Sequence, residues 1–363
     1  MSTGQLLLVG IPGPELDAET AALYRKIQPG GFVLFNRNMR SAAQLRKLLD
    51  DLRGLCEVEP ILTVDQEGGR VSRLSVFGNE PPNPQQLREK GAMDLIREHG
   101  RLTGQLMRLF GFNLNLSPVL DISFSEEADN SLRGRCFGRS PEEVVEKARL
   151  FNAAMRAEGV ASCAKHFPGF AAAAVDPHHE LPVIRRTAEQ MEQCELRPFR
   201  EMAGEVDAVM TGHAWYPCYD EQELAASLSP RIVTGLLREE LAYQGLIVTD
   251  DLDMGALLKS HTLNESLLAA LGAGNDMLMV CHRVESQLAG ARALMDAPRK
   301  QVDRALERIA RFKQTMQPSP AFSEQAYAAL DQEVWDLRVK TLGPERAKER
   351  SADTGKRSPV EDF

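Results

Sequence analysis

Eight short apolar runs recur along this chain, and their alternation with helical patterns limits the folds that it can adopt. Each run has the length and the unbroken apolar character of a strand that is buried on both faces of a parallel sheet. The segments between them carry helix-start signals, such as the capping-box spacing of Thr187 and Gln190 and the Ser140-Pro141 pair. The runs occupy residues 6–11, 31–35, 61–64, 114–122, 160–164, 208–211, 246–249 and 277–280. Strand–helix alternation repeated about eight times predicts an α/β protein built on a (β/α)8 TIM barrel.

A doubly wound open sheet is the other arrangement that such alternation can produce. In that fold a glycine-rich turn after the first strand holds the phosphates of a dinucleotide. Here the first run is followed by Gly10-Ile-Pro-Gly13, in which Pro12 lacks the amide that a phosphate would need. The barrel is therefore favoured, and no cofactor is predicted.

The pattern divides the chain into three parts. Residues 1–318 are predicted to form the barrel, the single catalytic domain, and residues 319–343 a C-terminal helical extension. Residues 344–363 are rich in charge, proline, serine and glycine and are predicted to be disordered. No other segment has the look of a second catalytic domain.

The net charge and the cysteines limit the partners and the cellular compartment that we expect. A formal net charge of −9 argues against a nucleic-acid partner, which would favour a basic surface. The 6 cysteines are scattered without a C-x-x-C pair, which predicts reduced thiols. The first residues lack a basic region and a long apolar segment, and no run reaches membrane-spanning length. We therefore expect a cytoplasmic protein without a membrane partner. We also expect a monomer.

Polar side chains gather directly after the apolar runs. In a barrel these strand ends converge on one mouth, so residues far apart in sequence become neighbours. Carboxylates beside arginine, lysine and histidine suit a ligand that is rich in hydroxyl groups. The residues concerned are Asp65, Glu67, Arg70, Arg73, Asp121, Lys165, His166, His213, Asp250 and Asp251.

The segment 165–182 concentrates ionisable groups: one lysine, three histidines and two carboxylates. A carboxylate two positions before an imidazole, as in Asp176 and His178, suits proton transfer. The alternative is a metal site made by the three histidines (166, 178 and 179) with Asp176, but their spacing matches no helical ligand pair. No metal site is predicted.

Several motifs occur here in an order that resembles glycoside hydrolase family 3. The resemblance covers residues 5–312 and is strongest to the single-domain β-N-acetylhexosaminidases of peptidoglycan recycling. The motifs are GFVLFNRN (31–38), VDQEGGRV (64–71), GRCFG (134–138), KHFPG (165–169), DPH (176–178), ASLSP (226–230) and VTDDLDM (248–254).

The resemblance implies a role for each matching position. Asp250 matches the nucleophile of a retaining mechanism, and His178 matches the acid/base, with Asp176 as its partner. Because successive strand residues face opposite ways, Asp250 and Asp251 are not expected to enter the site together. His179 misses the family spacing. The positions that match sugar-holding or site-orienting residues are Asp65, Arg73, Arg135, Lys165 and His166.

For other polar residues at the strand ends, a purely structural role is an alternative to a functional role. Asp121 and His213 could satisfy buried backbone groups at strand ends. Arg37, Asn38 and Arg70 could likewise be structural or lie at the rim.

The bridge between KHFPG and the Asp176/His178 pair departs from the family pattern. A polar, glycine-containing stretch is usual there, whereas residues 170–175 read FAAAAV, and Pro177 stands between the two paired residues.

The substrate that the resemblance implies is a small-molecule glycoside, an N-acetylglucosaminyl muropeptide fragment. The alternatives are a β-glucosidase or phosphorylase of the same family, and a catalytically silent sugar-binding barrel.

Overall fold

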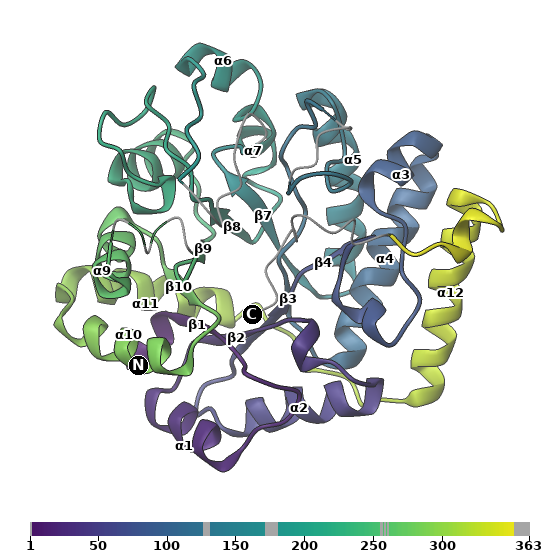
Figure 1. The fold of residues 1–363 in the computed structure, drawn as a ribbon, viewed down its shortest axis with the longest axis horizontal. Helices are drawn as coiled ribbons and strands as arrows, with labels where there is room; N and C mark the ends of the chain where they lie inside the picture. Colours follow the sequence, from purple (N-terminus) through teal and green to yellow (C-terminus); the bar gives the residue numbers. More distant parts are fainter. Residues whose placement is uncertain are drawn as a thin grey trace.

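Eight parallel strands close into a barrel at the centre of the computed structural model, and helices surround it (Figure 1). The structure describes residues 2–125, 131–170, 181–254, 257, 259 and 261–351. Neighbouring strands follow the chain around the barrel, and β10 pairs with β1 to close it. The strands are β1 (Leu7–Gly10), β2 (Gly31–Leu34), β3 (Ile61–Val64), β6 (Leu114–Asn115), β7 (Ala161–Phe167), β8 (Ala208–Thr211), β9 (Leu246–Asp251) and β10 (Met277–Val280). The predicted (β/α)8 barrel is confirmed.

The helices lie outside the barrel and bury their apolar faces against it (Figure 1). Thr187 and Gln190 form the predicted reciprocal capping box at the start of α6, and Ser140 caps α5 with Pro141 at its first position. The α-helices are α1 (Ala18–Ile27), α2 (Ala42–Gly54), α3 (Pro84–Lys90), α4 (Met93–Phe110), α5 (Pro141–Ala157), α6 (Ala188–Gln193), α7 (Arg197–Met202), α9 (Leu263–Ala273), α10 (Val284–Ala293), α11 (Arg299–Lys313) and α12 (Glu324–Leu342). A π-helix, η5 (Arg231–Glu240), and short 3-10 turns complete the described chain.

The prediction of one strand over residues 114–122 is wrong. The regular strand β6 ends after two residues, at Asn115. Pro118 follows, and proline has no N–H to donate to a strand ladder. Val119 returns to the sheet only through an isolated bridge to Lys165.

Two barrel strands each contain one residue more than the neighbour with which they pair. Between Ala164 and Phe167, β7 advances by three positions while β8 advances by two. Between Val248 and Asp251, β9 advances by three positions while β10 advances by two. Such β-bulges interrupt the alternation of side chains between the two faces of a strand. Both bulges lie at the carboxyl ends of their strands.

A small hairpin follows β3 and is formed by β4 (Gln66–Gly68) and β5 (Val71–Ser72). Its turn depends on two glycines. Gly68 and Gly69 have φ angles of 116° and 57°, a region that side chains with a Cβ rarely adopt. A Cβ at Gly68 would also lie 2.4 Å from the carbonyl oxygen of Pro82. The glycine pair of the DQEGGR run is therefore required by the backbone.

The chain after the barrel packs back onto the loop that follows this hairpin. Helix α12 lies beside α4 at the outer edge of the molecule (Figure 1), and Arg101 of α4 pairs with Glu333 at 2.7 Å. The buried Arg338 of α12 donates to the Glu80 carboxylate at 2.9 Å. Ser351 also donates to Glu80, from its hydroxyl at 2.7 Å.

The predicted C-terminal helix is present as α12, but the predicted start of the disordered tail needs a correction. Residues 344–351 contact the rest of the protein, because their polar and charged groups find partners there. Arg350, for example, donates to the carbonyl oxygens of Ser75 and Gly78. Residues 352–363 lie outside the described residues. The three-part domain division itself stays a prediction.

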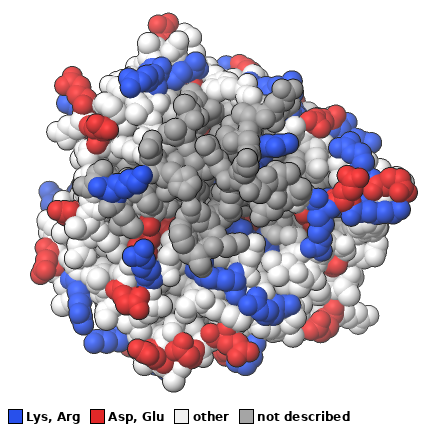
Figure 2. Space-filling model, viewed as in Figure 1, with Lys and Arg blue, Asp and Glu red and all other residues white. Residues whose placement is uncertain are grey.

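Acidic and basic side chains alternate around the visible face of the molecule, so both signs are interspersed at its rim (Figure 2). All six cysteines are described, and each is a free thiol, as predicted. Within the described ranges, no helix combines the length and the apolar character that crossing a membrane requires.

Candidate active site

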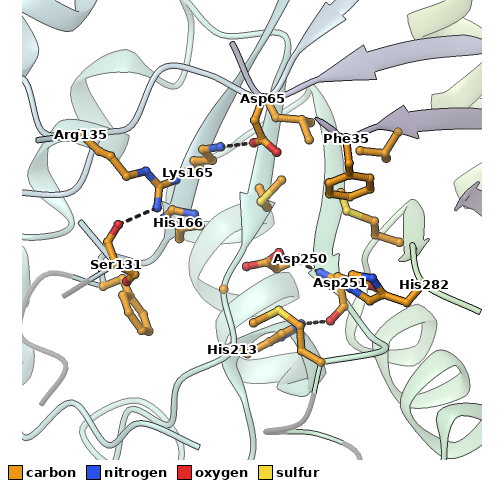
Figure 3. Close-up of a pocket in the computed structure, with 17 residues that line it drawn as sticks. Phe35, Asp65, Ser131, Arg135, Lys165, His166, His213, Asp250, Asp251 and His282 are labelled. Atoms are coloured by element: carbon orange, nitrogen blue, oxygen red, sulfur yellow. Dashed lines mark hydrogen bonds and ion pairs between the residues drawn. The ribbon is translucent and has the colours of Figure 1, made fainter. Parts of the chain in front are cut away.

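A pocket opens among the carboxyl ends of strands β2 to β10, the end at which barrel proteins collect their polar side chains (Figure 3). It brings together residues that are as far apart in sequence as Val33 and His282. Of the residues predicted to hold or attack a ligand, it contains Asp65, Arg135, Lys165, His166 and Asp250. The other polar lining residues are Ser131, His213, Asp251 and His282.

Four charged side chains form a buried network on one wall. Lys165 donates to Asp65 at 2.5 Å and to Glu67 at 2.7 Å. Arg135 binds both carboxylate oxygens of Glu67 at 2.8 Å. Lys165 and Glu67 are only 2% and 1% exposed, so the charges are compensated inside the protein. This bidentate geometry fixes the guanidinium and the ammonium relative to each other.

The ionisation of this network follows from its pairing. Burial opposes a charge on Glu67, but the Arg135 and Lys165 cations outweigh it and hold the pKa of Glu67 below its usual range. Burial likewise opposes the charge on Lys165, while Asp65 and Glu67 raise the pKa of that ammonium. Lys165 therefore stays a cation, suited to donating to ligand oxygens and not to accepting a proton.

His166 is oriented by a carboxylate. Its Nδ1 lies 2.7 Å from Oδ2 of Asp121, and its own backbone N–H donates to the same oxygen. Asp121 also accepts from the backbone N–H of Phe170 at 2.6 Å. The structural reading of Asp121 is thus confirmed: it satisfies backbone groups at a strand end and fixes His166. Because Lys165 and His166 lie in the β7 bulge, both line the pocket although they are consecutive.

The bulge in β9 overturns the expectation that only one of Asp250 and Asp251 enters the site, because both line the pocket. Their surroundings differ. Asp250 is half-buried, and its Oδ1 accepts the backbone N–H of Asp251 at 2.8 Å. Asp251 pairs with His282 at 2.6 Å and accepts the backbone N–H groups of Asp253 and Cys281. Asp251 is therefore the locally paired carboxylate.

Three further residues were predicted for the site. Arg73 is buried beside Asp65, with its Nη2 3.8 Å from the carboxylate, and among the described residues it does not belong to the pocket lining. Asp176 and His178 fall outside the described residues, so their roles stay predictions.

At the level of sequence His282 was missed, and Glu67 was named among the strand-end groups without a role. Glu67 lies inside the DQEGGR run, directly after an apolar strand. A carboxylate at such a place could have been predicted to be the counter-ion of Lys165 and Arg135. His282 follows the eighth apolar run by two positions, the same kind of place as His213 after the sixth.

The remaining residues for which a structural role was considered donate hydrogen bonds to backbone carbonyl oxygens. Arg37 and Asn38 both donate to the carbonyl oxygen of Ile11. Arg70 donates to the carbonyl oxygen of Ser131. His213 donates to that of Asp251 and also lines the pocket.

Apolar side chains also line the pocket. This combination suits a small ligand that presents polar groups at its edge and C–H groups on its faces, as a sugar ring does. The apolar lining residues are Val33, Phe35, Leu116, Phe170, Met210, Met254 and Met279.

The site lies in a chain whose family is shown by comparison with known proteins. Residues 2–312 match the model of the glycosyl hydrolase family 3 N terminal domain, so the chain belongs to this family. It is a glycoside hydrolase, and the predicted family is confirmed. A Beta-hexosaminidase of Alkalilimnicola ehrlichii is 35% identical over 297 residues, which are 80% of this chain and 84% of that protein. A Beta-hexosaminidase of Pseudomonas aeruginosa is 35% identical over 288 residues, 78% of this chain and 84% of that one.

Solved structures give the same result. A glycoside hydrolase family 3 β-N-acetylglucosaminidase from Paenibacillus sp. str. FPU-7 superposes with a TM-score of 0.84 at 32% identity, over 93% of this chain and 68% of that one. Native NagZ from Neisseria gonorrhoeae superposes with a TM-score of 0.78 at 28% identity, over 92% of this chain and 97% of that one.

Glu67→Gln is expected to destabilise the protein strongly. The substitution keeps the shape of the side chain but removes the carboxylate that Arg135 and Lys165 share, so a buried positive charge is left without compensation. Breaking a buried pair in this way costs about 3–5 kcal/mol in the free energy of unfolding. Urea unfolding followed by circular dichroism measures the loss.

The matched control is Glu59→Gln, the same chemical change in an exposed pair with Arg53. It should change the free energy of unfolding by about 1 kcal/mol or less. Equal losses for the two variants would contradict the importance of the buried network.

Proposed function

We propose that this protein is a retaining β-N-acetylhexosaminidase that releases terminal non-reducing N-acetylglucosamine from peptidoglycan-derived fragments, acting as a monomer in the cytoplasm. The observation that carries the proposal is the half-buried Asp250 carboxylate, which shares one pocket with Asp65, Arg135, Lys165 and His166 (Figure 3). The names of the curated relatives and of the Paenibacillus structure support the substrate class.

In the proposed first step, a carboxylate oxygen of Asp250 attacks the anomeric carbon and forms a covalent glycosyl-enzyme. The bond to the leaving glycosidic oxygen breaks, and His178, oriented by Asp176, gives that oxygen a proton. In the second step, His178 takes a proton from water, and the hydroxide formed displaces Asp250 from the sugar. The two displacements restore the original β configuration.

The described residues support the positioning that this chemistry needs. Lys165 is a permanent donor at one wall, and Asp65 is an acceptor held by it. His166 is fixed by Asp121, so its second ring nitrogen has one orientation. Fixed donors and acceptors of this kind bind hydroxyl groups in a single pose, which is the condition for an in-line attack.

A panel of aryl β-glycosides tests the proposal. The aryl N-acetylglucosaminide should be cleaved with a kcat/KM at least about 100-fold above those of the glucoside and the xyloside, since a site built for the acetamido group rejects sugars that lack it. The product should be free N-acetylglucosamine with or without phosphate in the buffer. Preferred cleavage of the glucoside, or a sugar 1-phosphate formed with phosphate, would replace the proposal by the β-glucosidase or the phosphorylase. Binding of the sugar without turnover would leave only a sugar-binding barrel.

A further inference from the structure

Asp251 is held more tightly than a strand residue requires. Its Oδ1 accepts two backbone N–H groups, those of Cys281 and Asp253, each at 3.1 Å. Its Oδ2 lies 2.6 Å from Nε2 of His282. Its backbone carbonyl oxygen lies 3.0 Å from Nε2 of His213. His282 therefore contacts the side chain of Asp251, and His213 holds its backbone.

The hydrogen-bond partners define the protonation of His213. A carbonyl oxygen can only accept, so Nε2 of His213 carries the proton and donates it to Asp251. Its Nδ1 then accepts from the hydroxyl of Ser227, 2.8 Å away. Burial lowers the pKa of His213 although the charge of Asp250 opposes this, which favours the neutral ring that such a chain needs. The hydrogen bond to Asp251 thus has one stable direction.

The group that both histidines immobilise is the one that contacts Asp250. The backbone N–H of Asp251 donates to Oδ1 of Asp250 at 2.8 Å. In a regular strand this N–H would belong to the ladder with a neighbouring strand. Here the β9 bulge interrupts the ladder just before Asp251, and the N–H of Asp251 donates to Asp250 instead. The direction of this N–H therefore depends on the groups that hold Asp251.

We propose that His282 and His213 are positioning residues for Asp250: they hold Asp251, at the end of the bulge, so that its amide orients the Asp250 carboxylate toward the sugar. The proposal rests on the proposed role of Asp250 as nucleophile. His282 acts through Asp251, because its Nε2 is engaged there and its side chain is only 11% exposed. Its ring also packs near Phe35, with the centroids 6.2 Å apart, which keeps the imidazole in place.

The chain offers a matched pair of variants at this position. Glutamine can place its amide nitrogen where Nε2 of histidine lies, whereas the shorter asparagine reaches only the position of Nδ1. His282→Gln should therefore keep a polar nitrogen beside Oδ2 of Asp251, and His282→Asn should lose it. We expect His282→Asn to lower kcat by about 10- to 100-fold, the loss typical of a slightly misplaced reacting group. KM should stay within about 2-fold, because the residues that hold the sugar are unchanged.

The experiment measures kcat and KM on the aryl N-acetylglucosaminide, together with the rate at which a 5-fluoro glycosyl fluoride labels Asp250, followed by mass spectrometry. A low kcat and slow labelling in His282→Asn, with both restored in His282→Gln, support the proposal. Wild-type rates in both variants overturn it. Equal losses in the two variants, accompanied by a raised KM, also overturn it, since they show a merely structural role.

Ser227→Ala provides a second variant if His282 cannot be replaced without loss of folding. It removes only the hydroxyl that holds His213, so kcat should fall by a few fold at unchanged KM, and an unchanged kcat would overturn the part assigned to His213. Asp250→Asn separates this inference from the function on which it rests. If that variant still turns over and wild-type Asp250 is not labelled, the proposed function fails; if Asp250 is labelled but both His282 variants behave as wild type, only the positioning role fails.

Discussion

Asp250→Asn should lower kcat by about 10,000-fold or more, the scale of loss seen when a catalytic nucleophile is removed. The amide keeps the size of the carboxylate and an oxygen that can accept the Asp251 N–H, so the pocket keeps its shape. What is lost is the charged oxygen that would attack the anomeric carbon. Steady-state kinetics on the aryl N-acetylglucosaminide measure the loss, and urea unfolding verifies that the variant is folded.

Two controls make this result specific. Asp303→Asn makes the same chemical change on the exposed side of α11 and should keep wild-type kinetics. Azide added to Asp250→Ala should restore turnover by entering from the vacated face and should give a glycosyl azide of the opposite anomeric configuration. Residual activity within about 10-fold of wild type in Asp250→Asn would contradict the assignment of the nucleophile.

His178→Ala should give the second large effect, a loss of about 100- to 10,000-fold with substrates whose leaving group needs a proton. A dinitrophenyl glycoside has a leaving group that departs as a stable anion. The first step should therefore be much less affected with that substrate, and the glycosyl-enzyme should accumulate because water is no longer activated. Pre-steady-state release of dinitrophenolate, seen as a burst, measures this.

The neighbouring histidine provides the matched control. His179→Ala removes an imidazole one position away in the sequence and should leave kcat/KM within about 3-fold of wild type. If the two histidine variants behave alike, or if the loss in His178→Ala is independent of the leaving group, the acid/base does not lie at residue 178.

Much of the barrel could be predicted because a strand buried on both faces must be a continuous apolar run, and such runs can be read from the sequence. The segments 61–64, 208–211 and 277–280 were predicted with the bounds that the structure has. The strand over 114–122 failed because the apolar character continues past Pro118, which cannot donate to a strand ladder, and beyond it the chain pairs only through the isolated bridge at Val119.

The polar side of the site was harder to predict. Its residues were found as strand-end groups, but which of them pair with one another depends on register. The extra residue in β9 results from the way in which two strands align, and no residue type indicates it. The sequence therefore could not show that Asp250 and Asp251 both line the pocket. The pairing of Glu67 with Arg135 joins positions that are 68 apart and needs the closed barrel to become visible.

The contact between Glu80 and Arg338 has a consequence for the way in which the protein is made. The two residues are 258 positions apart, and Ser351 follows Glu80 by 271. A carboxylate buried without its partners is costly, so the loop after the β4–β5 hairpin becomes stable only when α12 has docked. This hairpin carries Glu67, the anchor of the pocket's charged wall. The loop beside this hairpin is thus completed by segments that follow the barrel in sequence, and a polypeptide cut after α11 would hold all the strands of the barrel while Glu80 lacked these partners.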